Sequence, residues 1–146
     1  MLYALLLILH LAAAVAFIGT LFYQVVIWRA ATAGLPQAAL GELSARLSQV
    51  TRRVLHGVVL VLYGAGLGLA WQHRAALADP LSSAFASLLS LKILLALSIV
   101  GHYLAIALLL RRGRLDARRS QRLHLAILLQ MGLILVLAKA MFYLSW

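Results

Sequence analysis

The sequence predicts an all-α fold, a four-helix transmembrane bundle that forms a single integral-membrane domain over residues 1–146. Hydrophobic residues make up 65% of the chain and charged residues only 11%, and the mean hydropathy is +1.03. Four apolar stretches reach the roughly 20 residues that a membrane-spanning helix needs. The arginines gather in two of the three connections between these stretches. We therefore expect helices at about residues 3–28, 54–71, 85–110 and 123–144.

The first helix is expected to stay in the protein rather than to be removed as a signal peptide. No basic segment precedes its apolar run at residues 3–28. The run is also longer than the roughly 7–15 apolar residues of a signal peptide.

The first connection, at about residues 30–53, is too long for a tight turn. Gly34-Leu35-Pro36 should break the chain, because proline disfavours a helical residue before it. Apolar residues then recur at helical spacing with polar residues between them. This pattern predicts a short amphipathic helix at the membrane surface, carried by Leu40, Leu43, Leu47 and Val50.

Helix packing and helix starts can be placed in the remaining sequence. Gly64 and Gly68 form a small-xxx-small pair, which lets a neighbouring helix approach closely. In the second connection, at about residues 72–84, Asp79-Pro80 predicts a turn, and Ser82-Ser83 predicts a helix start. In the third connection, Asp116 is expected to cap the last helix.

The distribution of arginines predicts the orientation of the bundle. Ten of the eleven arginines lie in or beside the first and third connections, whereas only Arg74 lies in the second. Because basic residues favour the cytoplasmic side, both termini should lie on the outer (periplasmic) side of a bacterial cytoplasmic membrane. The basic loops should attract anionic lipid headgroups. Nucleic-acid binding is not expected, because the chain contains no recognition module.

Each predicted membrane helix carries one histidine, namely His10, His56, His102 and His124. Neutral imidazole is the commonest metal ligand and binds haem iron axially. Counted from the arginine-rich ends at 1.5 Å per residue, His56 and His124 lie within about a turn of the inner surface. These two are the predicted axial ligands of one haem b, and His102, about 13 Å deep, is the substitute. Interhelical hydrogen bonding is the alternative role for each histidine.

His10 lies near the opposite surface, in the same outer third as Lys92 and Lys139, the only lysines in the chain. Lysine within hydrocarbon costs about 2.5–3.5 kcal/mol. Both lysines could extend to the outer headgroups. Alternatively, this outer cluster binds an anionic group such as a haem propionate, a porphyrin carboxylate or a lipid phosphate. His73, in the second connection, is expected to be solvated.

The composition also limits the chemistry. The absence of cysteine excludes disulfides, thiolate ligands, iron–sulfur clusters and covalent haem attachment. The predicted helices contain no Asp or Glu, which weighs against a di-iron site or a carboxylate proton pump. Copper bound by the histidines remains an alternative, although the chain has only three methionines and no Met-x-x-Met motif.

Short motifs resemble a family of small bacterial membrane proteins. Leu9-His10-Leu11 and Gly19-Thr20-Leu21-Phe22-Tyr23 are similar to the first helix of HemJ-type protoporphyrinogen IX oxidases and the related CopD-type copper-resistance membrane domain. Leu91-Lys92, His102 and Lys139 follow in the order of the HemJ type. The resemblance implies a haem b-binding four-helix bundle and implies catalytic roles for His10 and Lys92.

The chain also departs from that family. The HemJ type has an arginine shortly after its Phe-Tyr, where this chain has Gln24-Val25-Val26. His124 stands where the family has a polar pair. The predicted function is therefore haem b-dependent electron transfer within the membrane. HemJ-type protoporphyrinogen IX oxidation and CopD-like copper handling are the alternatives. Membrane lipids and a quinone or porphyrin are the expected partners, and association into a homo-oligomer stays open.

Overall fold

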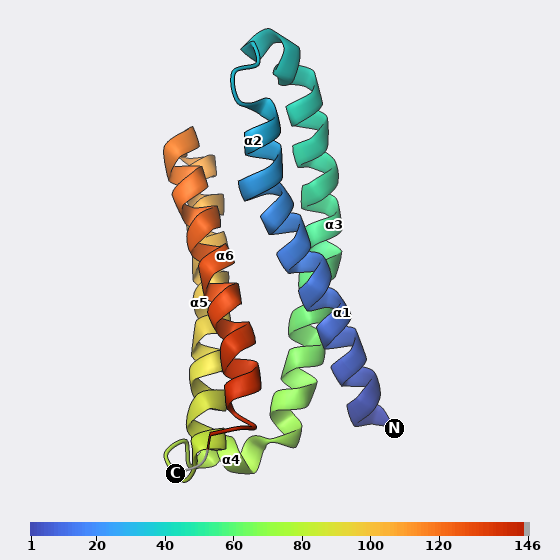
Figure 1. The fold of residues 1–146 in the computed structure, drawn as a ribbon, viewed down its shortest axis with the longest axis vertical. Helices are drawn as coiled ribbons and strands as arrows, with labels where there is room; N and C mark the ends of the chain where they lie inside the picture. Colours follow the sequence, from blue (N-terminus) through green and yellow to red (C-terminus); the bar gives the residue numbers. More distant parts are fainter. Residues whose placement is uncertain (145–146) are drawn as a thin grey trace. The chain divides into compact units, whose positions relative to one another are not determined.

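The computed structural model describes residues 1–144, except for the side chains of Gln37, Ala39 and Ala117. Within these residues every regular element is a helix (Figure 1). The elements are α1 (Leu2–Phe22), the π-helix η1 (Tyr23–Trp28), α2 (Arg29–Thr32), α3 (Gln37–Gln72), α4 (Arg74–Ala78), α5 (Ala84–Arg111) and α6 (Ala117–Ala140).

The helices form two compact units, one covering residues 1–72 and the other beginning at His73. In the first unit, α1, η1 and α2 run as one continuous rod beside α3; in the second, α5 and α6 run side by side (Figure 1). Four helical segments in the described part of the chain are long and apolar enough to cross a membrane. They are Leu2–Thr32, Leu40–Gln72, Ala84–Arg111 and Arg118–Ala140. The prediction of an all-helical chain with four membrane-length helices is thus confirmed.

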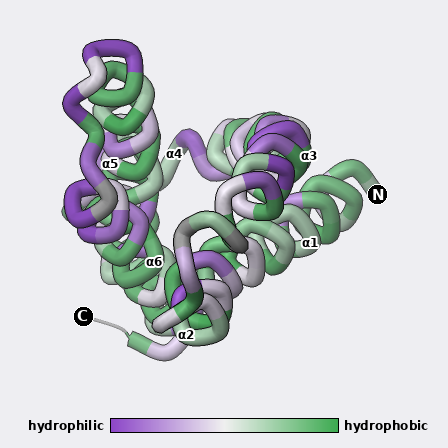
Figure 2. The backbone as a smooth tube through the Cα atoms, turned by 90° about the horizontal axis from the view of Figure 1, so that it is seen from above, coloured by the Kyte–Doolittle hydropathy of each residue, from purple (hydrophilic) through white to green (hydrophobic). Residues whose placement is uncertain are grey.

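The surface of the helices is apolar, as expected for contact with lipid. Figure 2 shows that α1 is mostly hydrophobic, whereas hydrophilic residues gather in α3 and in the connection between α5 and α6. Large aliphatic side chains point outward from the long helices; Leu60 on α3, for example, is 74% exposed. Such exposure is costly in water and costs nothing in hydrocarbon.

One face of α1 packs against α3. The buried residues Ala13, Phe17 and Leu21 recur at intervals of four, as a helix face requires. Toward the N-terminus, Leu6 and His10 continue this face and lie against Gly68 and Gly66 of α3. The predicted close approach at Gly68 is therefore confirmed. No described atom lies within 4 Å of a Cβ built on Gly64, so Gly66 rather than Gly64 is the second contact.

The first connection is much shorter than the sequence predicted. It spans residues 33–36, where Gly34 adopts a φ of 82° and Pro36 precedes α3. The expected break at Gly34-Leu35-Pro36 is confirmed. The residues of the predicted surface helix are helical, but the separate short helix is wrong, because α3 runs without interruption from Gln37 to Gln72. The predicted start of the second membrane helix at Val54 is therefore also wrong.

The reason for the continuous helix is local. Between Pro36 and Val54 the sequence contains no proline, and its polar residues are compatible with a helix. An ion pair of 3.0 Å between Arg46 and Glu42, one turn apart, also supports the helix there. Polarity marks where α3 leaves the hydrocarbon, but polarity does not end a helix.

In the second unit, capping and turn residues determine where the long helices begin and end. Ser83 caps α5, since its Oγ accepts a hydrogen bond from the Ala86 N–H at 3.2 Å. At the other end, Gly113 has a φ of 62°, and the Arg114 N–H donates to the Leu109 carbonyl at 2.9 Å, which closes the helix as a Schellman motif does. Asp116 caps α6 through the Arg119 N–H at 2.6 Å, as predicted.

Because of this cap, α6 begins at Ala117, six residues before the predicted start at 123. The arginines between these positions lower the hydropathy of the segment but are good helix formers. At its C-terminus α6 ends at Ala140 rather than at 144, and the apolar residues that follow form a turn.

Candidate functional site

The histidines of the later helices share one local geometry. The Nδ1 atom of each lies within hydrogen-bond distance of the carbonyl oxygen four residues earlier. The partners are Arg52 at 2.6 Å for His56, Ser98 at 2.8 Å for His102 and Ser120 at 2.7 Å for His124. The helix itself therefore orients all three rings.

These hydrogen bonds determine which ring nitrogen carries the proton. A carbonyl oxygen only accepts, so Nδ1 is the donor in each pair. In the neutral ring Nε2 then holds the lone pair, which is the form that binds a metal. Histidines that bind metals usually donate their other N–H to a carbonyl or carboxylate in this way. In each of the three neutral rings, Nε2 is therefore the nitrogen that holds the lone pair.

His10 makes the same kind of Nδ1 hydrogen bond, but to a carbonyl oxygen of a different helix. Its Nδ1 donates across the α1–α3 contact to the carbonyl oxygen of Leu62, at 2.9 Å. Gly66, four residues after Leu62, leaves this carbonyl accessible because it has no side chain. A Cβ built on Gly66 would lie 3.1 Å from Cε1 and 3.2 Å from Nδ1 of His10. Sequence reasoning placed His10 near the outer surface and missed this role of Gly66.

The structure places two of the predicted ligands in the same helical hairpin. Gln130 donates from Nε2 to Ser98 Oγ at 2.9 Å, which sets the register between α5 and α6. From that pair, four residues lead to His102 and six lead back to His124, both toward the connecting loop. At about 1.5 Å per residue, the two histidines differ in height by only about 3 Å. His56 lies on α3 in the first unit, and its side chain is exposed.

Ser98 and Gln130 are polar residues that the sequence analysis did not select. Ser98 accepts from Gln130 and itself donates to the Leu95 carbonyl at 2.8 Å, while its own carbonyl holds His102. Interhelical hydrogen bonds of this kind hold helices together in hydrocarbon. The signal that could have revealed them is a polar side chain in the middle of each of two apolar helices.

The two lysines lie toward the other end of the same hairpin. Lys92 precedes Ser98 by six residues and Lys139 follows Gln130 by nine, so both lie on the side of that pair away from the loop, at heights that differ by about 4.5 Å. Lys92 is half-buried and Lys139 is exposed. His10, the third residue of the predicted outer cluster, belongs to the first unit.

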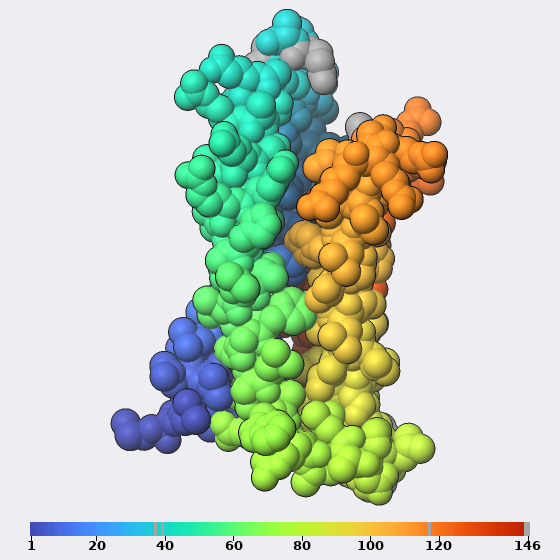
Figure 3. Space-filling view, turned by 180° about the vertical axis from the view of Figure 1, so that it is seen from behind, coloured from blue at the N-terminus to red at the C-terminus, as the bar shows by residue number. Residues whose placement is uncertain are grey.

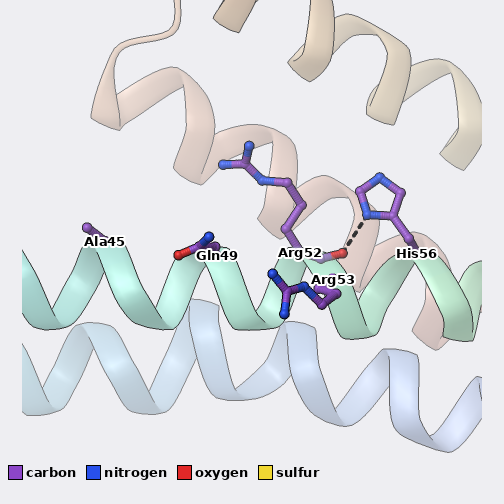
Figure 4. A pocket seen from close by; sticks show the side chains of 5 residues that line it. All are labelled: Ala45, Gln49, Arg52, Arg53 and His56. Carbon is purple, nitrogen blue, oxygen red and sulfur yellow. Dashed lines mark hydrogen bonds between the residues drawn. The ribbon is translucent and has the colours of Figure 1, made fainter.

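A shallow depression of about 370 Å³ lies on α3 beside His56. Figure 4 shows Arg52 and His56 extending from the same side of the helix, with the hydrogen bond from the ring to the Arg52 carbonyl. The residues that line the depression are Ala45, Gln49, Arg52, Arg53 and His56. Sequence reasoning treated these arginines as orientation signals and as a general attraction for anionic headgroups, and it did not predict the depression.

In the part of the chain that the structure describes, no three or more His, Cys, Asp or Glu side chains gather closely enough to hold a metal ion. A haem needs only two axial ligands from the protein, because the porphyrin supplies the other four. No known protein family, curated protein or solved structure matches the chain significantly.

Proposed function

We propose that the protein binds haem b and transfers electrons within a bacterial cytoplasmic membrane. The observation that carries this proposal is the shared hydrogen-bond geometry of the helix histidines. His56, His102 and His124 each donate from Nδ1 to a main-chain carbonyl and so present Nε2 as a ligand. When bound, the haem iron supplies one-electron redox chemistry.

In this proposal His124 is one axial ligand and His56 is the other, with His102 as the substitute. His102 gains support from its height, which is within about 3 Å of that of His124 on the neighbouring helix. The helix surface beside two of the histidines also leaves room for a flat ring. No described atom lies within 4 Å of a Cβ built on Gly57 or on Gly101, the residues next to His56 and His102.

As in the sequence-based expectation, the proposal also includes an outer site formed by the two lysines and His10. Lys92 and Lys139 supply positive charge, and His10 supplies an oriented imidazole. Such groups suit the propionates of a haem, a quinone or a porphyrin carboxylate. The proposed orientation, with both termini periplasmic and the arginine-rich connections cytoplasmic, follows from the distribution of arginines.

Haem titration of the purified protein tests the proposal. We expect a Soret band that saturates at a fixed ratio of haem to protein, and iron rather than copper in metal analysis. The matched control is His73→Ala, which removes the histidine of the second connection. It should bind haem as the unaltered chain does. Absence of a saturable Soret band, or stoichiometric copper without haem, would overturn the proposal.

A further inference from the structure

The depression on α3 contains two arginines, Arg52 and Arg53, that the proposed electron transfer does not use, beside His56, which is a proposed haem ligand. Ala45, Gln49, Arg52 and His56 are spaced three or four apart and so occupy one face of the helix, and Arg53, next to Arg52, lies at the edge of that face. Arg52 and Arg53 supply two guanidinium groups and Gln49 an amide. No carboxylate within residues 1–144 pairs with either arginine. Glu42, the nearest acidic residue along α3, is bound to Arg46.

The depth of this surface follows from the length of the apolar half of α3. The apolar run from Val54 to Trp71 contains 18 residues. At 1.5 Å per residue it is about 27 Å long, close to the roughly 30 Å of a bilayer's hydrocarbon core. Arg52 and Arg53 come directly before this run. They therefore lie at the level of the lipid phosphates.

The same helix face continues into the hydrocarbon as an apolar strip. Leu60 and Leu67 follow His56 at helical spacing and are 74% and 70% exposed. They lie about 12 Å and 22 Å along the helix from Arg52. In Figure 3, α3 can be followed along its length, from its cyan beginning to its green end. One face thus combines a basic end with an apolar strip of lipid-chain length.

We propose that this face of α3 binds an anionic phospholipid. Its phosphate lies in the depression between the guanidinium groups of Arg52 and Arg53, and one acyl chain follows Leu60 and Leu67. Arginine suits this role because its planar fork can donate two hydrogen bonds to one phosphate. The proposal does not depend on haem, since Arg52, Arg53, Leu60 and Leu67 are the residues that would contact the lipid and none of them is a proposed haem ligand.

Native mass spectrometry of the purified protein with added dioleoyl-phosphatidylglycerol tests the site. We expect one tightly bound lipid and much weaker binding of zwitterionic dioleoyl-phosphatidylcholine. The double variant Arg52→Gln/Arg53→Gln should weaken phosphatidylglycerol binding about 30-fold, since each basic residue near an anionic surface contributes about fivefold. The double variant Arg52→Lys/Arg53→Lys, which keeps the charge but not the fork, should lose much less affinity.

The matched control is Arg111→Gln/Arg112→Gln, which removes the same charge from the end of α5. It should change the affinity less than twofold. Equal losses in the two glutamine double variants would contradict a defined site, because they would indicate general attraction to a basic surface. Unchanged binding in Arg52→Gln/Arg53→Gln, or equal binding of the two lipids, would also overturn the proposal.

Two further measurements separate this site from the haem site and from misfolding. His124→Ala removes a proposed haem ligand, and phosphatidylglycerol binding should be unchanged in it. Loss of lipid binding in that variant would contradict the independence of the two sites. The lysine double variant keeps the charge of the helix, so its retained binding shows that the loss in the glutamine variant comes from the charge and not from misfolding.

Discussion

At the scale of single residues, the histidines are defined by their hydrogen bonds as much as by their positions. His124 donates from Nδ1 to the Ser120 carbonyl at 2.7 Å, and this leaves Nε2 as the basic nitrogen. The sequence identified all four helix histidines as candidates. It did not identify their carbonyl partners, because a partner depends on the side-chain rotamer, and for His10 it also depends on a second helix.

The first prediction concerns the axial ligands. His124→Ala should convert a low-spin, six-coordinate haem into a high-spin form or abolish haem binding. His56→Ala and His102→Ala decide between the two candidate partners, since only the true ligand should have the same effect. Absorption and electron paramagnetic resonance spectra of the purified variants measure this. An unchanged spectrum in His124→Ala would remove that residue from the ligand set.

The second prediction concerns the α1–α3 contact. Gly66→Ala places a methyl group about 3.1 Å from the His10 ring and should lower the free energy of unfolding by about 1–3 kcal/mol. Gly64→Ala is its control, because the same methyl group meets no described atom within 4 Å there. That variant should be neutral or stabilised by up to about 1 kcal/mol through helix propensity. Thermal unfolding in detergent compares the two, and equal effects would contradict this packing.

At the scale of the helix, ends and caps could be predicted from sequence where a residue has a single structural role. Gly34, Ser83 and Asp116 all mark helix boundaries as expected. The continuity of α3 was not predicted. The polar segment before Val54 has the hydropathy of a connection. It contains no proline after Pro36, however, so its backbone continues as a helix. The apolar segment that crosses the membrane can therefore be shorter than the helix that contains it.

The third prediction concerns the start of α6. Asp116→Ala removes the acceptor of the Arg119 N–H and should destabilise the protein by about 1 kcal/mol. The accompanying ion pair to Arg119, at 3.6 Å and exposed, adds little. Asp116→Asn keeps a capping oxygen and should retain most of the stability. If Asn and Ala were equally destabilising, the cap would not be the source of the effect.

At the scale of the whole molecule, hydropathy was sufficient to predict four membrane-length helices. It was not sufficient to predict which helices pack together. The structure packs α1 against α3 and α5 against α6, through specific small residues and the Gln130–Ser98 hydrogen bond. A single sequence indicates which residues share one face of a helix. It does not indicate which other helix packs against that face.

The fourth prediction tests the proposed orientation. The chain contains no cysteine, so single cysteines introduced at Ser48 or Ser82 can be labelled without background. In intact cells, a membrane-impermeant maleimide should label Ser82→Cys, in the second connection. Ser48→Cys, near the arginine-rich beginning of α3, should react only after lysis. The reverse pattern would place both termini in the cytoplasm.

The most direct test of the proposed haem site is the absorption spectrum of the purified protein, recorded oxidised and then reduced, after expression with added haem. Two histidine ligands predict a low-spin haem b. Its Soret band should shift on reduction, and a sharp α-band should appear. A protein that folds as a helical membrane protein yet shows no Soret band in either state would contradict the account.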